Sequence, residues 1–111
     1  MTTQDFTNDI DTVLCVGDGY WFFKGNKCLK TNMAGDKFLV DEIDITASRA
    51  WPALAGTPFE RDLDAITFST ESGYYWFLKG DLCIATNGNG DQIVCSQRKI
   101  AGGGGWPVLD Q

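Results

Sequence analysis

The sequence predicts an all-β fold made of two copies of one four-stranded unit. A set of motifs recurs at a fixed offset of 55 residues along the 111-residue chain. Within each copy, short segments rich in aromatic and β-branched residues are separated by Gly-rich turns, which is typical of strands joined by hairpins. A unit of about 50 residues that holds four strands has the size of a β-propeller blade, and a β-sandwich needs no such repeat.

Matched motifs define the repeat. Residues 20–25 (YWFFKG) recur as residues 75–80 (YWFLKG), and residues 51–54 (WPAL) recur as 106–109 (WPVL). At the same offset, Cys28 matches Cys83, Thr31-Asn32 matches Thr86-Asn87, and Gly35-Asp36 matches Gly90-Asp91. The opening residues 9–12 match 62–65 at an offset of 53, so we expect two extra residues in a turn near 71–73. Residues 1–111 are thus one domain, with a first blade at about 9–54, a linker at 55–61 and a second blade at about 62–109.

Each copy is expected to contain four strands. Gly17 and Gly25 mark turns, because glycine tolerates the positive φ angles of tight hairpins. The last segment of the first copy is less regular, and we expect it to be a strand with some helical character. The predicted strands are 11–16, 20–24, 27–31 and 37–45 in the first copy, and 65–69, 74–79, 82–86 and 92–96 in the second.

Composition excludes several classes of function. The formal net charge is −6, so we expect neither nucleic acid nor an anionic membrane surface as a partner. The chain contains no His, which excludes Ser–His and Cys–His catalysis within it and removes the usual haem ligand. Residues 1–11 are polar and acidic rather than apolar, unlike a secretory signal, and we therefore expect a cytoplasmic protein.

The four cysteines, Cys15, Cys28, Cys83 and Cys95, contain no CxxC pair, so a zinc site is not predicted. We interpret them as small apolar core residues. Pairing of Cys83 with Cys95 on adjacent strands is an open alternative.

The motifs resemble those of hemopexin-like repeats. The run at 20–26 (YWFFKGN) is similar to the second-strand signature of that family, and 10–13 and 63–66 resemble its opening motif. The WPxL motifs at 51–54 and 106–109 resemble its closing motif. The resemblance implies a four-bladed propeller, of which this chain holds two blades. We therefore expect a homodimer that completes the ring, and no bound haem.

The resemblance also implies an ion in the central channel. The backbone carbonyls of Asp11 and Asp64 would face a calcium or sodium ion, and the amides of Val13 and Ile66 would face an anion. The alternative is that Asp11 and Asp64 only brace their blades. Asp9 and Asp62 lie beside them in the sequence. They are candidates for an acidic ring that binds a polyamine, or are ordinary solvated carboxylates.

Four aromatic residues, Tyr20, Trp21, Tyr75 and Trp76, are candidates for stacking on sugars or for packing between blades. Trp51 and Trp106 are interpreted as packing anchors. Gly102–Gly105 lacks the Lys-Ser/Thr of a phosphate-binding loop and is interpreted as a flexible connection.

The sequence favours a ligand-binding, lectin-like protein whose propeller binds a small molecule, a polyamine or a carbohydrate. One alternative is an enzyme that uses the dimer channel as a shaped pocket for a cyclisation or isomerisation. The other is a structural or protein-interaction module. No residue set in the sequence forms a catalytic constellation, so the prediction leans away from an enzyme.

Overall fold

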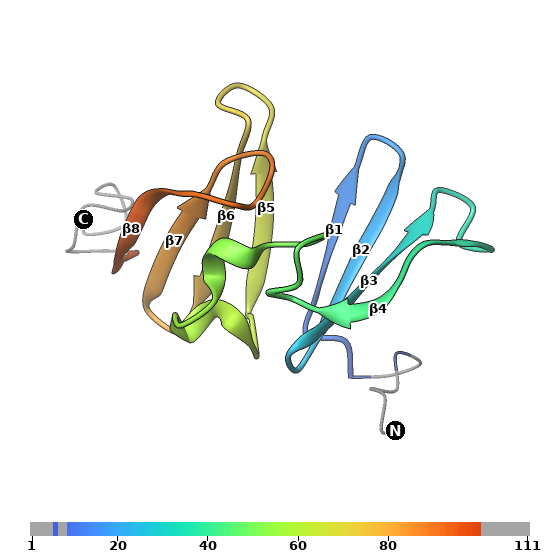
Figure 1. Cartoon of the computed structure of the whole chain (residues 1–111), viewed down its shortest axis with the longest axis horizontal. Helices are drawn as coiled ribbons and strands as arrows, with labels where there is room; N and C mark the ends of the chain where they lie inside the picture. Colours follow the sequence, from blue (N-terminus) through green and yellow to red (C-terminus); the bar gives the residue numbers. More distant parts are fainter. Residues whose placement is uncertain (1–5, 7–8, 101–111) are drawn as a thin grey trace.

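The computed structural model describes Phe6 and residues 9–100, which form two four-stranded antiparallel sheets (Figure 1). The first sheet contains β1 (Thr12–Val16), β2 (Gly19–Lys24), β3 (Lys27–Asn32) and β4 (Phe38–Asp44). The second contains β5 (Ala65–Ser69), β6 (Tyr74–Lys79), β7 (Leu82–Thr86) and β8 (Ile93–Lys99). Two short 3₁₀ helices, η1 (Pro52–Leu54) and η2 (Pro58–Glu60), lie between them. The prediction of an all-β fold with two four-stranded units is confirmed.

Strand bounds follow the sequence closely, with one correction. The expectation of helical character in the fourth segment is wrong, because Phe38–Asp44 is a strand throughout. Its irregular pattern has a different cause: the β3–β4 register shifts between Cys28 and Lys30. The β7–β8 register shifts at the matching place, between Cys83 and Ala85. A bulge of this kind breaks the alternation of side chains along a strand, so the periodicity is disturbed without any helix.

The predicted insertion lies in a turn. Two residues, Gly17 and Asp18, connect β1 to β2, whereas residues 70–73 connect β5 to β6. Gly73 in the longer turn has a φ of 76°, which a residue with a side chain rarely adopts. The change of offset from 53 to 55 residues is therefore absorbed between two strands, where it disturbs no strand pairing.

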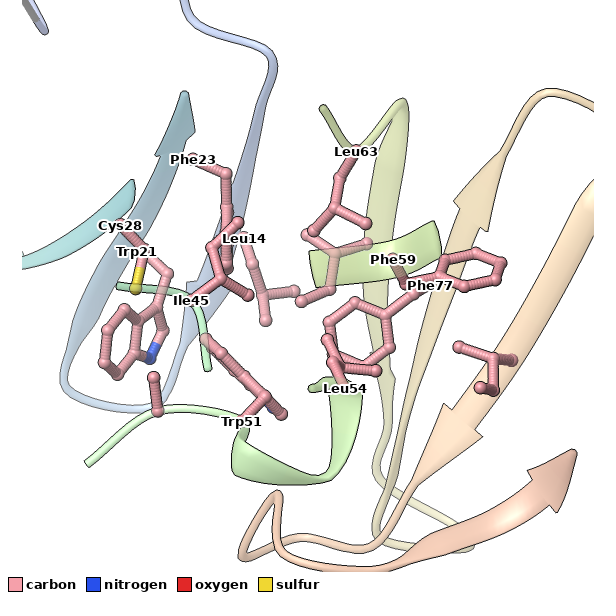
Figure 2. Packing of buried hydrophobic residues seen from close by; sticks show 13 residues of the cluster. Leu14, Trp21, Phe23, Cys28, Ile45, Trp51, Leu54, Phe59, Leu63 and Phe77 are labelled. Atoms are coloured by element: carbon pink, nitrogen blue, oxygen red, sulfur yellow. The ribbon is translucent and has the colours of Figure 1, made fainter. Parts of the chain in front are cut away.

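One face of each sheet packs against the other sheet, and the first strands, β1 and β5, lie side by side in this contact (Figure 1). Alternate residues of each strand point into this contact, as the pleat requires. The first sheet contributes Leu14, Trp21 and Phe23, and the second contributes Phe77, all of them buried (Figure 2). Ile66 of the second sheet belongs to the same cluster. The core of the molecule is thus a seam between two blades.

Trp51 fills the middle of this seam. Its ring centroid lies 5.0 Å from that of Trp21 and 5.3 Å from that of Phe23 on one side. On the other side it lies 5.2 Å from Tyr75 and 5.7 Å from Phe77, in edge-to-face geometry. Only 2% of Trp51 is exposed. Its interpretation as a packing anchor is confirmed, and the ring joins the two sheets through four aromatic contacts.

A glycine allows the backbone beside Trp51 to approach the second sheet. Gly90, in the β7–β8 turn, has a φ of 74°. A Cβ atom there would lie 2.5 Å from the carbonyl oxygen of Ala50 and 2.8 Å from the Trp51 ring. The Gly90 carbonyl instead accepts a hydrogen bond of 3.0 Å from the Ala53 amide. Gly90 is thus required both by its backbone conformation and by the close contact.

Residues 55–61, assigned to a linker, are packed rather than loose. Pro58 begins η2, and the Thr57 hydroxyl accepts a hydrogen bond of 3.1 Å from the Phe59 amide. This cap turns the fully buried Phe59 into the core. The Lys79 ammonium donates to the carbonyls of Pro58 and Arg61 at 2.8 and 2.9 Å. The connection therefore holds the blades together as well as joining them.

We predict that Trp51→Ala lowers the free energy of unfolding by about 3–5 kcal/mol, because it removes a buried ring with four aromatic neighbours. Urea denaturation measures the change. The control is Val94→Ala on the 40% exposed Val94, which should cost about 0.5 kcal/mol or less. Equal losses in the two variants would show that Trp51 does not join the blades.

A second prediction concerns alkaline stability. Burial raises the pKa of the Cys28 thiol from its ordinary value of 9.0 to about 12. The folded protein keeps this proton at a pH where the unfolded chain has lost it. The resulting stability is fully present below pH 9 and is lost as the pH rises toward 12.

This thiol should contribute a slope of up to about 1.4 kcal/mol per pH unit to the decline of stability above pH 9. Urea denaturation at several pH values measures that slope, which should be shallower in Cys28→Ala than in the wild type. An unchanged slope would mean that Cys28 is not a protonated core thiol.

Candidate functional site

An open cleft of about 580 Å³ lies between the β1–β2 hairpin of the first sheet and the β5–β6 hairpin of the second. The cleft adjoins the aromatic seam, because Tyr75, which lines it, also contacts Trp51. Both polar and apolar side chains line it. The lining residues are Cys15, Val16, Gly17, Asp18, Lys30, Phe68, Thr70 and Tyr75.

An ion pair forms one wall of the cleft. The Lys30 ammonium lies 2.7 Å from a carboxylate oxygen of Asp18 and 5.6 Å from the centroid of the Trp21 ring. The hydrogen bond from Lys30 is the largest cause of a lowered pKa of Asp18. The wall therefore presents an ionised carboxylate and a fixed ammonium, one acceptor and one donor group for a polar ligand.

Tyr75 forms the aromatic side of the cleft. Its ring lies 4.8 Å from Phe68 and contacts Trp51 in the seam. Burial, and then the negative charge of Asp18, raise the pKa of the Tyr75 phenol. The hydroxyl therefore keeps its proton near neutral pH and can donate a hydrogen bond.

The predicted aspartates take two different positions. The carboxylate of Asp11 accepts a hydrogen bond of 2.9 Å from the Gly25 amide, and that of Asp64 accepts one of 2.6 Å from the Gly80 amide. Gly25 and Gly80 are the matching residues of the two β hairpin turns. Each carboxylate thus ties the start of its blade to the turn after the second strand, as the bracing interpretation expects.

Asp9 and Asp62 share an unusual backbone. Their φ angles are 53° and 54°, in the left-handed region that aspartate tolerates better than most residues. The Asp62 amide donates a hydrogen bond of 2.9 Å to the carbonyl of Gly25, and its carboxylate lies 3.2 Å from Arg61. Asp62 therefore meets Asp11 at Gly25, at the junction of the blades. In the repeat, Asp9 matches Asp62, and Asp64 matches Asp11.

Among the residues that the structure describes, no group of three or more His, Cys, Asp or Glu side chains could hold a metal ion. The ion expected at Asp11 and Asp64 would depend on their backbone carbonyls, since the two carboxylates are engaged with glycine amides. That ion stays a prediction, as does the anion expected at the amides of Val13 and Ile66.

The aromatic candidates for sugar contact divide between seam and surface. Trp21 is 7% exposed and belongs to the seam, as the packing alternative expects. Tyr20, Tyr75 and Trp76 are half-buried, and of these Tyr75 lines the cleft. Trp106 and Gly102–Gly105 lie outside the described residues.

The cysteines are four free thiols. Cys28 and Cys83 are fully buried, which confirms the core interpretation for this matched pair. Cys95 is half-buried, and no disulfide joins it to Cys83. Cys15 corrects the core interpretation, since it is exposed on β1 at the edge of the cleft.

Sequence reasoning missed most of the cleft, including Asp18, Lys30 and Phe68. A usable signal is the difference between the copies. Lys30 corresponds to Ala85, Cys15 corresponds to Phe68, and Asp18 stands where the second copy has its longer turn. The cleft is therefore lined by residues at positions where the two copies of the repeat differ.

Comparisons with known proteins identify the fold. No protein-family model matches the sequence. No curated protein matches it either. Among solved structures, it is similar to a hemopexin-fold protein, CP4, from cow pea, with 28% identity and a TM-score of 0.78. The match covers 94% of this chain and 47% of that one.

Two further solved structures are similar. A 2S albumin seed protein from Dolichos has 27% identity and a TM-score of 0.78, over 94% of this chain and 48% of its own. A plant lectin with two metal-binding sites from Cicer arietinum has 24% identity and a TM-score of 0.71, over 85% of this chain and 43% of its own. The chain therefore spans about half the length of the structures it matches.

The comparison overturns one expectation. The similar structures include seed albumins, and on this finding the expectation of a cytoplasmic protein is wrong. No helix in the described part of the chain is long and apolar enough to cross a membrane.

The sheet order, the repeated strands and the matches over 94% of the chain agree with the resemblance drawn from the motifs. The chain has a hemopexin-like fold and supplies two blades of it.

Proposed function

We propose that this chain is a lectin-like binding protein that takes a small polar ligand, a sugar first of all, in the cleft between its two blades. The observation that carries the proposal is the composition of that cleft. It combines the Tyr75 and Phe68 rings with the Asp18–Lys30 ion pair. Aromatic faces suit the C–H surface of a sugar ring, and a fixed carboxylate and ammonium suit its hydroxyl groups.

The comparisons favour a sugar over other small polar ligands. The similar structure from Cicer arietinum is a plant lectin. The cleft's polar groups are placed in advance: Lys30 is held by Asp18 and by the Trp21 ring. Groups that are already oriented lose little freedom on binding, which raises affinity for a weakly binding ligand such as a monosaccharide.

We further propose that the protein works as a homodimer. Two blades leave sheet faces uncovered, and a second copy would supply the remaining half of a four-bladed ring. Such a dimer carries two equal clefts. Two binding sites on one particle allow it to cross-link cells or polymers that display the ligand.

The channel of that ring is the proposed place for a cation. Asp11 and Asp64 directly precede the first strands of the two blades, and their carbonyls would converge with those of the second copy on calcium or sodium. The acidic side chains of Asp9 and Asp62 would add negative potential for a polyamine at the same mouth. The presence of two metal-binding sites in the Cicer arietinum lectin favours an ion of this kind.

We predict that wild-type protein binds simple sugars and that Asp18→Ala weakens this binding about tenfold or more, because a charged hydrogen-bond acceptor is lost. Calorimetry with glucose, galactose and N-acetylglucosamine measures affinity, and agglutination of red cells measures cross-linking.

The matched control is Asp44→Ala. It breaks the Lys27–Asp44 ion pair, which has a similar length of 2.6 Å but lies outside the cleft. Absence of binding to all three sugars, or equal losses in the two variants, would contradict the proposed site. Turnover of a small molecule without sugar binding would instead favour the enzyme alternative, and the absence of both would favour a structural module.

For the channel ion, we predict that calcium raises the melting temperature, since a ligand that binds only the folded state stabilises it. Asp11→Ala should cost about 1–2 kcal/mol by removing the acceptor for the Gly25 amide. The calcium response should nevertheless persist in this variant, because the proposed ligand is a carbonyl. No calcium or sodium response in the wild type would contradict the ion. Loss of the response in Asp11→Ala alone would assign it to the carboxylate.

A further inference from the structure

Two backbone contacts add to the side-chain packing of the seam between the two blades, and each occurs once among the described residues. The first is the hydrogen bond from the Asp62 amide to the Gly25 carbonyl, which ties the start of the second blade to a turn of the first. The residues that match Asp62 and Gly25 in the repeat are Asp9 and Gly80. Asp9 has the same left-handed backbone as Asp62, with φ angles of 53° and 54°. Gly80 has the same conformation as Gly25, with φ angles of 58° and 59°, and is exposed.

The second contact is the approach of the Trp51 segment to Gly90. Gly35, the match of Gly90, has a φ of 75°, almost equal to the 74° of Gly90. Space next to it is open, however, since no atom lies within 4 Å of a Cβ placed there. Gly35 is exposed, whereas Gly90 is buried. The segment that matches 50–53 is 105–108, which contains the second Trp-Pro pair and lies outside the described residues.

The side-chain contact repeats in the same way. The second blade faces the first with Ile66, Phe77 and Ile84, which are 6%, 0% and 2% exposed. The matching residues on the far face of the first blade are Val13, Phe22 and Leu29, and all three are apolar. Val13 is 44% exposed and Phe22 is half-buried, whereas Leu29 is only 6% exposed. A hollow of about 260 Å³ beside them is lined by Phe22, Leu29, Phe6 and Phe38 among others.

We infer that these unused halves meet between two copies of this chain. The far face of the first blade, formed by Val13, Phe22 and Leu29, receives the far face of the partner's second blade. The Asp9 amide donates to the partner's Gly80 carbonyl, and the partner covers Gly35 as the backbone of Ala50 and Trp51 covers Gly90 in the existing seam. A twofold axis repeats this seam, so the ring closes with four blades.

The occupant is a second copy because one chain carries both halves of the missing contact. Asp9 and Gly35 lie on the first blade, while Gly80 and the second Trp-Pro motif belong to the second. Each half is the repeat of a partner already joined in the seam that the structure contains. This inference rests on the proposal of a homodimer and names the surfaces that form it.

The test is the mass of the protein in solution, measured by analytical ultracentrifugation over a range of concentrations. Wild type should have a mass of 24.4 kDa, twice the 12.2 kDa of one chain. Val13→Glu should raise the dimer dissociation constant about a hundredfold or more, because it places an unpaired carboxylate in the seam. Val94→Glu is the control: Val94 is 40% exposed, and its match, Leu39, is 41% exposed and so is not buried by the existing seam.

A glycine pair tests the backbone contact. Gly35→Ala and Gly73→Ala introduce the same strain, since their φ angles are 75° and 76°, and neither Cβ meets an atom of its own chain within 4 Å. Only Gly35→Ala should weaken the dimer, about tenfold or more, because only Gly35 matches a glycine, Gly90, that the existing seam buries.

The outcomes separate two failures. A wild-type mass of 12.2 kDa would overturn both the homodimer and this seam. A wild-type dimer that survives Val13→Glu and Gly35→Ala unchanged would overturn the seam alone, leaving the homodimer to another surface. Sugar binding is measured separately, because neither substitution touches the cleft.

Discussion

The packing of Trp51 between two sheets is the contact on which the rest of the structure depends. Each sheet has only four strands of five to seven residues, too few to bury a core alone. Trp51 belongs to neither sheet, and its ring contacts Trp21 and Phe23 on one side and Tyr75 and Phe77 on the other. The same contact holds Tyr75 at the edge of the cleft, so the geometry of the candidate site follows from the packing of the core.

Positions that match between the two copies of the repeat and positions that differ have different roles in this chain. Matched residues such as Asp11 and Asp64 make the same hydrogen bond in both blades, to Gly25 and Gly80. These positions build a blade and say little about function. The cleft uses positions where the copies differ, above all Lys30, which corresponds to Ala85. An ion pair therefore stands on one side of the cleft only, and a ligand would meet a charged wall opposite an aromatic one.

The strands could be predicted from the sequence because their signal is local. Turn glycines and aromatic runs indicate the hairpins, and each strand pattern occurs in both copies of the repeat, which supports its assignment. The site could not be predicted in this way. Whether a carboxylate such as that of Asp11 faces an ion or an amide depends on a turn 14 residues away. The cleft brings Asp18 beside Tyr75 only after the blades have packed, so no short motif contains it. The irregular pattern of β4 was misread as partly helical for a related reason, because its cause is a shift in the register of its pairing with β3.

Bulges and charges mark the outer edges of the two sheets. The outer strands β4 and β8 are sheet edges, which invite pairing with other chains. Both carry a bulge, and both carry charges, with Asp41 and Asp44 on β4 and Lys99 on β8. These are devices that prevent edge pairing. The far face of the first blade carries Val13, Phe22 and Leu29 as cross-strand neighbours, and of these Val13 is 44% exposed and Leu29 6%. An apolar row without such devices suits the proposed contact with a second copy, because exposed apolar patches mark surfaces that bind other molecules.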